Sequence, residues 1–314
     1  MTTAVDMYDV SDTLLYSTGK GNWKGFQVPL SSIVKAAESW KKLCANHSKL
    51  WLCWNVDPDW CLVQQKLARE CGYTPLVGGD SRARPPKLID GAIYIDFNKH
   101  LNLPMFHMVL AIEFAFLYVP DKLAFWHSDL LVRREKLHRI ADKMDLMSDK
   151  EMLVTLPGRG MKQRLLGQQR RYWELIGCTN RKISEHQFKR GAGWMANIMY
   201  HPMSPQDQVE KRRRAKQYYD HGAGVLYWAE HYKPKDCQIH VIKEALLDEG
   251  HFSRIRAKNY RSVSPNNAKR DLTSELSLNF NLKDEAAKLG LSDLIAPEDV
   301  STDNVISMTR ASGR

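Results

Sequence analysis

Short apolar runs alternate with amphipathic, helix-like segments from Lys49 onward, and this order constrains the fold more than any other feature of the chain. The apolar runs are short enough for buried strands, whereas the segments between them have the spacing and length of helices. Strands that alternate with helices predict an open, mainly parallel sheet with helices on both faces, an α/β fold. The expected strands are 50–54, 73–77, 92–95, 123–126 and 239–242, and the expected helices are 29–45, 59–70 and 103–118.

The run 123–126 ends abruptly in His127-Ser128-Asp129. A parallel strand covered on both faces reads as a continuous apolar run, and sheets of this kind bind ligands at the carboxyl ends of their strands. A carboxylate there, two residues after an imidazole, has the chemistry to hold a hard divalent cation against a diphosphate. The competing interpretation is that Asp129 caps the next helix and that His127 only packs locally.

Composition limits the class of protein. With 314 residues, of which 43% are hydrophobic, the chain can bury the core of one large domain or of two small ones. It has no apolar run long enough to span a membrane, and residues 1–12 carry three aspartates and no basic residue, unlike a signal peptide. The six cysteines form no Cys-x-x-Cys pair, which indicates free thiols. We therefore expect a cytoplasmic protein with no membrane partner.

Positive charge is concentrated in the second half of the chain. The net charge is +10, and nine basic residues between Arg159 and Arg190 are opposed only by Glu174 and Glu185. A second basic cluster, Lys211 to Arg214, follows. Clusters of this kind are the electrostatic footprint of a polyanion partner. The alternative is an ordinary solvated basic surface.

The order of these parts resembles a known family. A first strand ends in the polar turn Trp54 to Asp57, and a long helix precedes the strand that ends in His127-Ser128-Asp129. Asp220 stands just ahead of a helix-like segment, and His251 follows the strand 239–242. This plan is similar to that of nucleotide-sugar-dependent glycosyltransferases of the GT-A fold, and the resemblance covers roughly 49–254. Their signature Asp-x-Asp binds a divalent metal and the diphosphate of the donor, and here histidine replaces its first acid.

The resemblance implies a site for a nucleoside-diphosphate sugar and a divalent metal, Mn²⁺ or Mg²⁺. Asp129, His127 and His251 would hold the metal. Asp220 would act as general base toward the acceptor hydroxyl, with Glu185 as second choice. The donor would be bound by residues near the ends of the first strands and in the metal motif: Trp54, Asn55, Asp57, Arg82, Arg84, Lys87 and Ser128.

The middle of the chain is predicted to carry acceptor specificity. Its aromatic and amide side chains suit a pocket for an unstacked base, and the candidates are Trp173, Asn180, Gln187 and Trp194. The basic residues that would meet DNA phosphates are Arg170, Arg171, Lys211, Arg212, Arg213 and Arg214. The combination points to phage glycosyltransferases that modify hydroxymethylated pyrimidines in double-stranded DNA; a phage enzyme would work in the host cytoplasm. The alternative is that the aromatic residues belong to the core.

The predicted organisation has three parts: an N-terminal extension with one helix (1–48), a GT-A-like catalytic domain (49–256), and a polar C-terminal arm and tail (257–314). Three other functions stay open. They are a glycosyltransferase with a sugar or glycan acceptor, a nucleotidyltransferase, which also needs a carboxylate-held metal, and a non-enzymatic nucleic-acid-binding protein. The sequence does not set the sugar, the stereochemistry of transfer or the oligomeric state.

Overall fold

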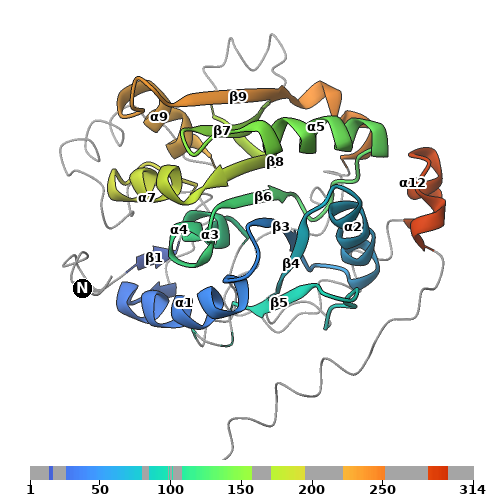
Figure 1. The fold of residues 1–314 in the computed structure, drawn as a ribbon, viewed down its shortest axis with the longest axis horizontal. Coiled ribbons are helices and arrows are strands. Elements are labelled where there is room, and N and C mark those ends of the chain that lie inside the picture. The colour runs from blue at the N-terminus through green and yellow to red at the C-terminus, as the bar shows by residue number, and fades with distance from the viewer. Residues whose placement is uncertain are drawn as a thin grey trace, which may run out of the picture.

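A computed structural model describes residues 14–16, 26–79, 85–97, 99, 101, 108–157, 171–194, 222–251 and 282–295. Its centre is a seven-stranded sheet in the order β5-β4-β3-β6-β8-β7-β9, which runs from β9 at the top of Figure 1 to β5 at the bottom. The strands are β3 (Lys49–Trp54), β4 (Thr74–Gly79), β5 (Ile93–Asp96), β6 (Lys122–Trp126), β7 (Glu151–Leu156), β8 (Trp173–Asn180) and β9 (Gln238–Lys243).

The sheet is mainly parallel, as predicted. β5, β4, β3 and β6 pair parallel to one another, and so do β7 and β9. Only β8 runs against its neighbours β6 and β7. A separate two-stranded antiparallel ribbon consists of β1 (Leu14–Tyr16) and β2 (Phe26–Val28).

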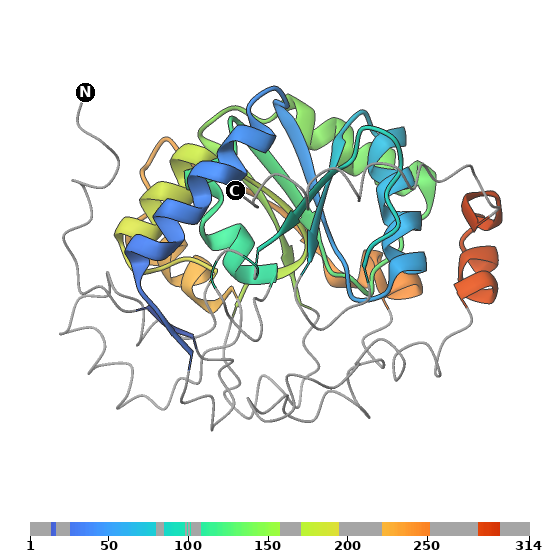
Figure 2. The same ribbon diagram turned by 90° about the horizontal axis from the view of Figure 1, so that it is seen from below.

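Helices cover both faces of the sheet, and each face has its own hydrophobic cluster (Figure 2). One face is covered by α1 (Leu30–Cys44), α3 (Met108–Glu113), α4 (Ala115–Tyr118), α7 (Arg181–Lys189) and α9 (Ala223–His231). The other is covered by α2 (Pro58–Glu70) and α5 (Arg134–Leu146), and α12 (Leu282–Lys288) adds side chains to the same cluster from outside these helices. Because α1 packs into the same core as the sheet, the predicted N-terminal extension contributes to this fold.

Local sequence explains where the central elements begin and end. Leu50 to Trp54 and Leu123 to Trp126 are fully or almost fully buried, as a strand covered on both faces requires. The Asp57 side chain accepts hydrogen bonds from the backbone N–H groups of Asp59 and Trp60, and Pro58 occupies the first turn of α2. The helix ends before Gly72, whose φ of 77° favours glycine.

One expected helix is interrupted. Instead of a single helix over 103–118, the structure has α3 and α4 with a break at Phe114, and residues 102–107 lie outside the described part. The Leu117 N–H donates to the Phe114 carbonyl, three residues back, which is the tighter 3₁₀ pattern. Apolar periodicity does not report such a local change of hydrogen-bond pattern, because the buried face stays the same.

The C-terminal segment 282–295 is fastened to the outside of α2 and α5. The Lys66 ammonium group donates to the Leu294 carbonyl at 3.0 Å. Arg134 contacts the carboxylates of both Glu70 and Asp293, and Arg133 donates to the Lys288 carbonyl at 2.8 Å. Apolar side chains of this segment, Ala286, Leu289, Leu291 and Leu294, complete the cluster on this face.

All six cysteines are free thiols, as the sequence indicated. Burial raises the pKa of five of them well above the ordinary range and that of Cys237 to a lesser degree, so the protein keeps these groups neutral. Among the described helices, none combines the length and the apolar character that crossing a bilayer requires.

The chain reverses its direction of growth across the sheet between β3 and β6. From β3 the chain adds β4 and then β5 on one side, and it then returns to place β6 on the other side of β3. The strand order thus reverses between β3 and β6, and open α/β sheets bind their ligands beyond the carboxyl ends of the strands at such a switch point. Trp54 and Trp126 end the two strands there, followed by Asn55 and His127.

Candidate metal centre

His127, Asp129 and His251 come together at the carboxyl end of β6. One ligand atom from each residue lies within 4.8 Å of the others. The Asp129 Oδ1 atom is 3.4 Å from His127 Nδ1 and 3.7 Å from His251 Nε2. Ligands that share an ion at about 2.1 Å lie roughly 3–3.5 Å apart. The two distances to Asp129 are close to this spacing, so the three side chains could hold one cation after a small inward shift.

The turn that carries His127 and Asp129 is fixed by backbone hydrogen bonds. The Leu130 N–H donates to the His127 carbonyl at 3.1 Å, and the His127 N–H donates to the Leu175 carbonyl of β8 at 2.9 Å. Gln64, fully buried on α2, donates its amide to the carbonyls of both His127 and Leu130 at 2.8 Å. Asp129 does not cap α5, because Arg133 occupies the N-cap position of that helix. These contacts hold the turn in a single conformation.

His251 reaches the site through a second backbone contact. It forms an isolated antiparallel bridge with Leu130, and the Leu131 N–H donates to the Gly250 carbonyl at 2.9 Å. A Cβ atom on Gly250 would lie only 1.8 Å from the Leu131 carbonyl oxygen. Only glycine permits this approach, so Gly250 is needed to bring the third side chain to the first two.

Glu174 lies behind His127. Its Oε1 atom is 3.1 Å from His127 Nε2, whereas the other ring nitrogen, Nδ1, faces Asp129. The Glu174 side chain is only 1% exposed and belongs to β8, in which every residue is buried. A histidine that binds a metal through one nitrogen commonly donates the other N–H to a carboxylate of this kind.

An aromatic side chain and a cation border the centre. The Trp173 ring lies edge-to-face with His127 at 5.6 Å and with His251 at 5.1 Å between centroids. The guanidinium of Arg171 lies over the same tryptophan ring at 5.0 Å. A positive charge therefore lies one ring away from the three candidate metal ligands, where it can attract an anionic ligand.

The ligand set suits a divalent first-row ion. Two imidazoles and one carboxylate fill three positions, which leaves others for water or for an oxygen of a bound substrate. Imidazole is a better ligand for Mn²⁺ or a later ion than for Mg²⁺, which prefers oxygen. The arrangement can thus hold an exchangeable cation and an anionic ligand together.

The residues predicted to bind the donor have different positions. Asn55 is buried at the end of β3, and its N–H donates to the Gly78 carbonyl at 2.7 Å. Trp54 is buried and stacks on Phe97. The Asp57 side chain caps α2, Lys87 pairs with Asp59, and Ser128 lies between two metal-binding residues. Arg82 and Arg84 lie outside the described residues.

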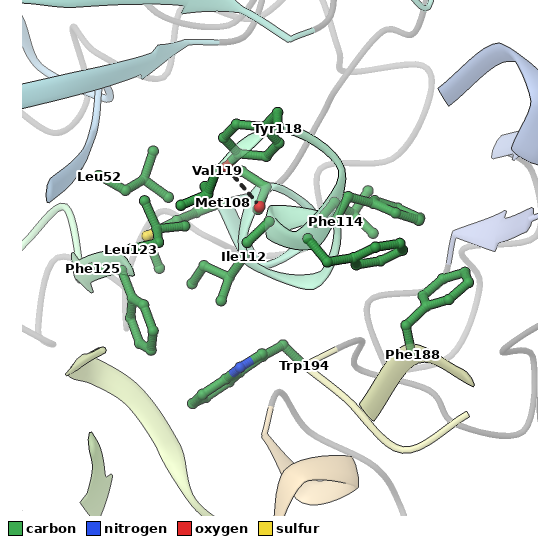
Figure 3. Close-up of a cluster of buried hydrophobic side chains, with 14 of the residues drawn as sticks. Leu52, Met108, Ile112, Phe114, Tyr118, Val119, Leu123, Phe125, Phe188 and Trp194 are labelled. Atoms are coloured by element: carbon green, nitrogen blue, oxygen red, sulfur yellow. Dashed lines mark hydrogen bonds between the residues drawn. The ribbon is translucent and has the colours of Figure 1, made fainter. Parts of the chain in front are cut away.

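Of the residues predicted for the acceptor, only Trp173 lies at the metal centre. Asn180 pairs with Lys122 at the other end of β6, and its side chain caps α7. Gln187 is buried on α7 against the sulfur of Met152. Figure 3 shows Trp194 inside the hydrophobic core, where its ring meets Phe125 edge-on at 5.1 Å. The structure does not bring these three side chains to the metal centre.

Of the residues predicted to act as general base or to contact DNA phosphates, the structure describes only Glu185 and Arg171. Glu185 lies on α7 and pairs with Lys189 at 2.7 Å. Arg171 stands beside Trp173. Asp220, Arg170 and the cluster Lys211, Arg212, Arg213 and Arg214 lie outside the described residues.

Two residues of the site escaped the sequence analysis, although each left a signal. Glu174 is the only acid in an otherwise apolar run, and such an acid in a buried strand needs a partner. Gln64 is a polar residue next to Val63 on a helix that buries its neighbours. Neither signal names its partner, because the contacts join residues 47 and 63 positions apart.

Comparisons with known proteins add no relative: no protein-family model, no curated protein and no solved structure matches the chain. A fold of this class hosts many activities, and the residues of the site distinguish among them.

Proposed function

We propose that the protein is a metal-dependent glycosyltransferase that moves a sugar from a nucleoside-diphosphate sugar to an acceptor hydroxyl. The observation that supports this best is the group His127, Asp129 and His251 at the carboxyl end of β6, beside the switch point of the sheet. A diphosphate is the ligand that a cation at this position would neutralise.

The chemistry divides between charge stabilisation and proton removal. A divalent ion, when bound, supplies charge to the departing diphosphate. Asp129 and the two histidines hold it, and Arg171 beside Trp173 adds a cation for the same anion. We assign the contact with the nucleoside part of the donor to Asn55, which is buried at the end of β3. For the attacking hydroxyl, Asp220 is the proposed base.

For the acceptor, we propose DNA that carries hydroxymethylated pyrimidines. The support is the net charge of +10 and the basic clusters of the sequence. Residues 158–170 join the carboxyl end of β7 to the start of the antiparallel β8, and both ends of this connection lie at the end of the sheet where the metal centre is. This supports the proposal, because the sequence of this connection contains Arg159, Lys162, Arg164 and Arg170.

The test is a set of parallel incubations. The purified protein is given a panel of nucleotide sugars with Mn²⁺ or Mg²⁺, and released nucleoside diphosphate is measured with three acceptors: a hydroxymethylated duplex, an unmodified duplex and a free sugar. We expect release only with the hydroxymethylated duplex. Release of nucleoside diphosphate with the free sugar alone would show that the acceptor is a glycan and not DNA. The protein would still be a glycosyltransferase.

Other outcomes reject the enzyme class. In a parallel incubation with nucleoside triphosphates in place of the nucleotide sugars, release of pyrophosphate would indicate a nucleotidyltransferase. Salt-sensitive DNA binding, with no nucleotide-sugar binding in the presence of metal, would indicate a nucleic-acid-binding protein without transferase activity.

A further inference from the structure

We propose that Glu174 is a positioning residue that fixes His127 so that its Nδ1 atom, and not Nε2, binds the metal. The inference depends on the metal centre within the proposed function. It names an atom and a residue to which the sequence assigned no role.

The two nitrogens of the His127 ring have different neighbours. Nε2 lies 3.1 Å from Glu174, and Nδ1 lies 3.4 Å from the Asp129 oxygen that also faces His251. A carboxylate only accepts hydrogen bonds, so Nε2 carries the proton that it donates to Glu174. Nδ1 is then left with a lone pair directed at the metal-binding group.

The surroundings keep this arrangement in place. The Trp173 ring packs edge-on against His127, the His127 N–H donates to the Leu175 carbonyl, and Gln64 holds the His127 carbonyl. A ring rotation that turned Nε2 toward Asp129 would give up the hydrogen bond between Nε2 and Glu174 in the buried strand β8. Leaving a buried carboxylate without that bond is costly, so the contact resists rotation.

A second pair in the same sheet provides a matched control. His240 Nε2 lies 2.8 Å from Glu151 Oε1 at the other end of β7, with side chains 27% and 21% exposed. Glu151 is not part of the metal-binding group. The substitution Glu151→Gln therefore makes the same chemical change in a histidine–glutamate pair without touching the site.

The experiment measures Mn²⁺ affinity by electron paramagnetic resonance in the absence of any substrate. We expect Glu174→Gln to weaken Mn²⁺ binding by about 10–100-fold, the usual effect of removing an outer carboxylate partner, and Glu151→Gln to leave it unchanged. In a His127→Ala background, Glu174→Gln should have little further effect, because Glu174 acts through His127. An equal loss in both backgrounds would overturn the proposal.

The ring nitrogen is identified separately. Zn²⁺ is added to wild-type protein with ¹⁵N-labelled histidine, and the nitrogen shifts are read with His127→Ala for assignment. We expect the metal-induced shift at Nδ1, with Nε2 protonated; a metal-bound Nε2 would overturn the proposal. This measurement decides the question even where Glu174→Gln fails to fold.

The two proposals fail in different ways. If the wild-type protein binds Mn²⁺ but transfers no sugar, the proposed function is wrong, and the role of Glu174 is still decided by the affinities. If the wild-type protein binds neither Mn²⁺ nor Zn²⁺, both the metal centre and the proposed role of Glu174 are wrong.

Discussion

The two ends of the sheet each carry a histidine–glutamate pair, and the pairs differ in what surrounds them. His240 and Glu151 are partly exposed at the amino end, where other oppositely charged pairs, such as Lys150 with Asp236, stand nearby. His127 and Glu174 have side chains only 5% and 1% exposed at the carboxyl end, beside Asp129 and His251.

The difference shows that the energetic contribution of a histidine–glutamate contact depends on its burial. An exposed ion pair exchanges its partner for water at little cost and contributes at most about 1 kcal/mol. A buried group of two carboxylates and two imidazoles is expensive to assemble, and proteins keep such groups where a cation or a function compensates. The buried end is therefore where we propose the metal centre, and we assign only surface electrostatics to the exposed end.

The largest effect expected is at Asp129. Asp129→Asn keeps the shape but removes the charge that two imidazoles face. We expect Mn²⁺ affinity to fall by more than about 100-fold, beyond the loss from an outer partner, with sugar transfer abolished. Titration calorimetry measures the affinity. Asp149→Asn, in a surface pair with Lys182, is the control and should bind Mn²⁺ normally. Equal Mn²⁺ affinities for Asp129→Asn and Asp149→Asn would contradict the proposal that the metal binds at the carboxyl end of the sheet.

The second effect concerns the glycine that brings His251 to the site. Gly250→Ala puts a methyl group against the Leu131 carbonyl, so we expect a loss of roughly 3 kcal/mol in unfolding free energy, together with weaker Mn²⁺ binding. Gly72→Ala is the control, because Gly72 has a positive φ but a Cβ atom added there would meet no atom within 4 Å. We expect Gly72→Ala to lower the unfolding free energy by only about 1–2 kcal/mol and to leave Mn²⁺ binding unchanged. Urea unfolding and Mn²⁺ titration test both; normal metal binding by Gly250→Ala would contradict the assignment of His251.

The smallest effect is electrostatic and belongs to the exposed end. The Ser148 backbone N–H, followed by the His240 ring, lowers the pKa of Glu151 from 4.5 to about 2. A lowered carboxyl pKa stabilises the fold fully above its unfolded value, and this contribution disappears as pH falls from about 5 to about 2.

Glu151→Gln isolates this contribution. We expect it to cost less than about 1 kcal/mol at pH 7, because the pair is partly exposed, and its unfolding curve should approach that of the wild type as the pH is lowered toward 3. Urea midpoints at both pH values measure the change. A gap that widens on acidification would show that another group controls the acid response.

The sheet was predictable because burial on both faces leaves a clear mark in sequence. The runs that became β3 and β6 are continuously apolar, and the structure places them within a residue of the expected bounds. The antiparallel direction of β8 left no such mark, since a fully buried strand reads the same in either direction. The aromatic and amide side chains of 172–180 instead favoured the interpretation of this segment as part of a binding pocket.

The candidate site was predictable in part. The motif that ends β6 and the histidine after β9 stood out because polar residues follow apolar runs there, and the structure brings them together. Aromatic and amide residues gave a weaker signal. Trp194 fills the core and Gln187 is buried against Met152, because these residue types serve packing as readily as binding. Glu174 and Gln64 were missed because their roles arise from contacts between distant strands and helices.

The C-terminal segment behaves toward the rest of the protein as a tethered ligand. Residues 282–295 dock on α2 and α5 after the thirty residues 252–281, and Leu289 lies against Gly250, next to His251. The tether keeps the segment at a high effective concentration, which allows modest contacts to hold it in place. A single peptide-bond cleavage within 252–281 would turn this docking into an association between two molecules. The packing beside His251 would then depend on how dilute the protein is.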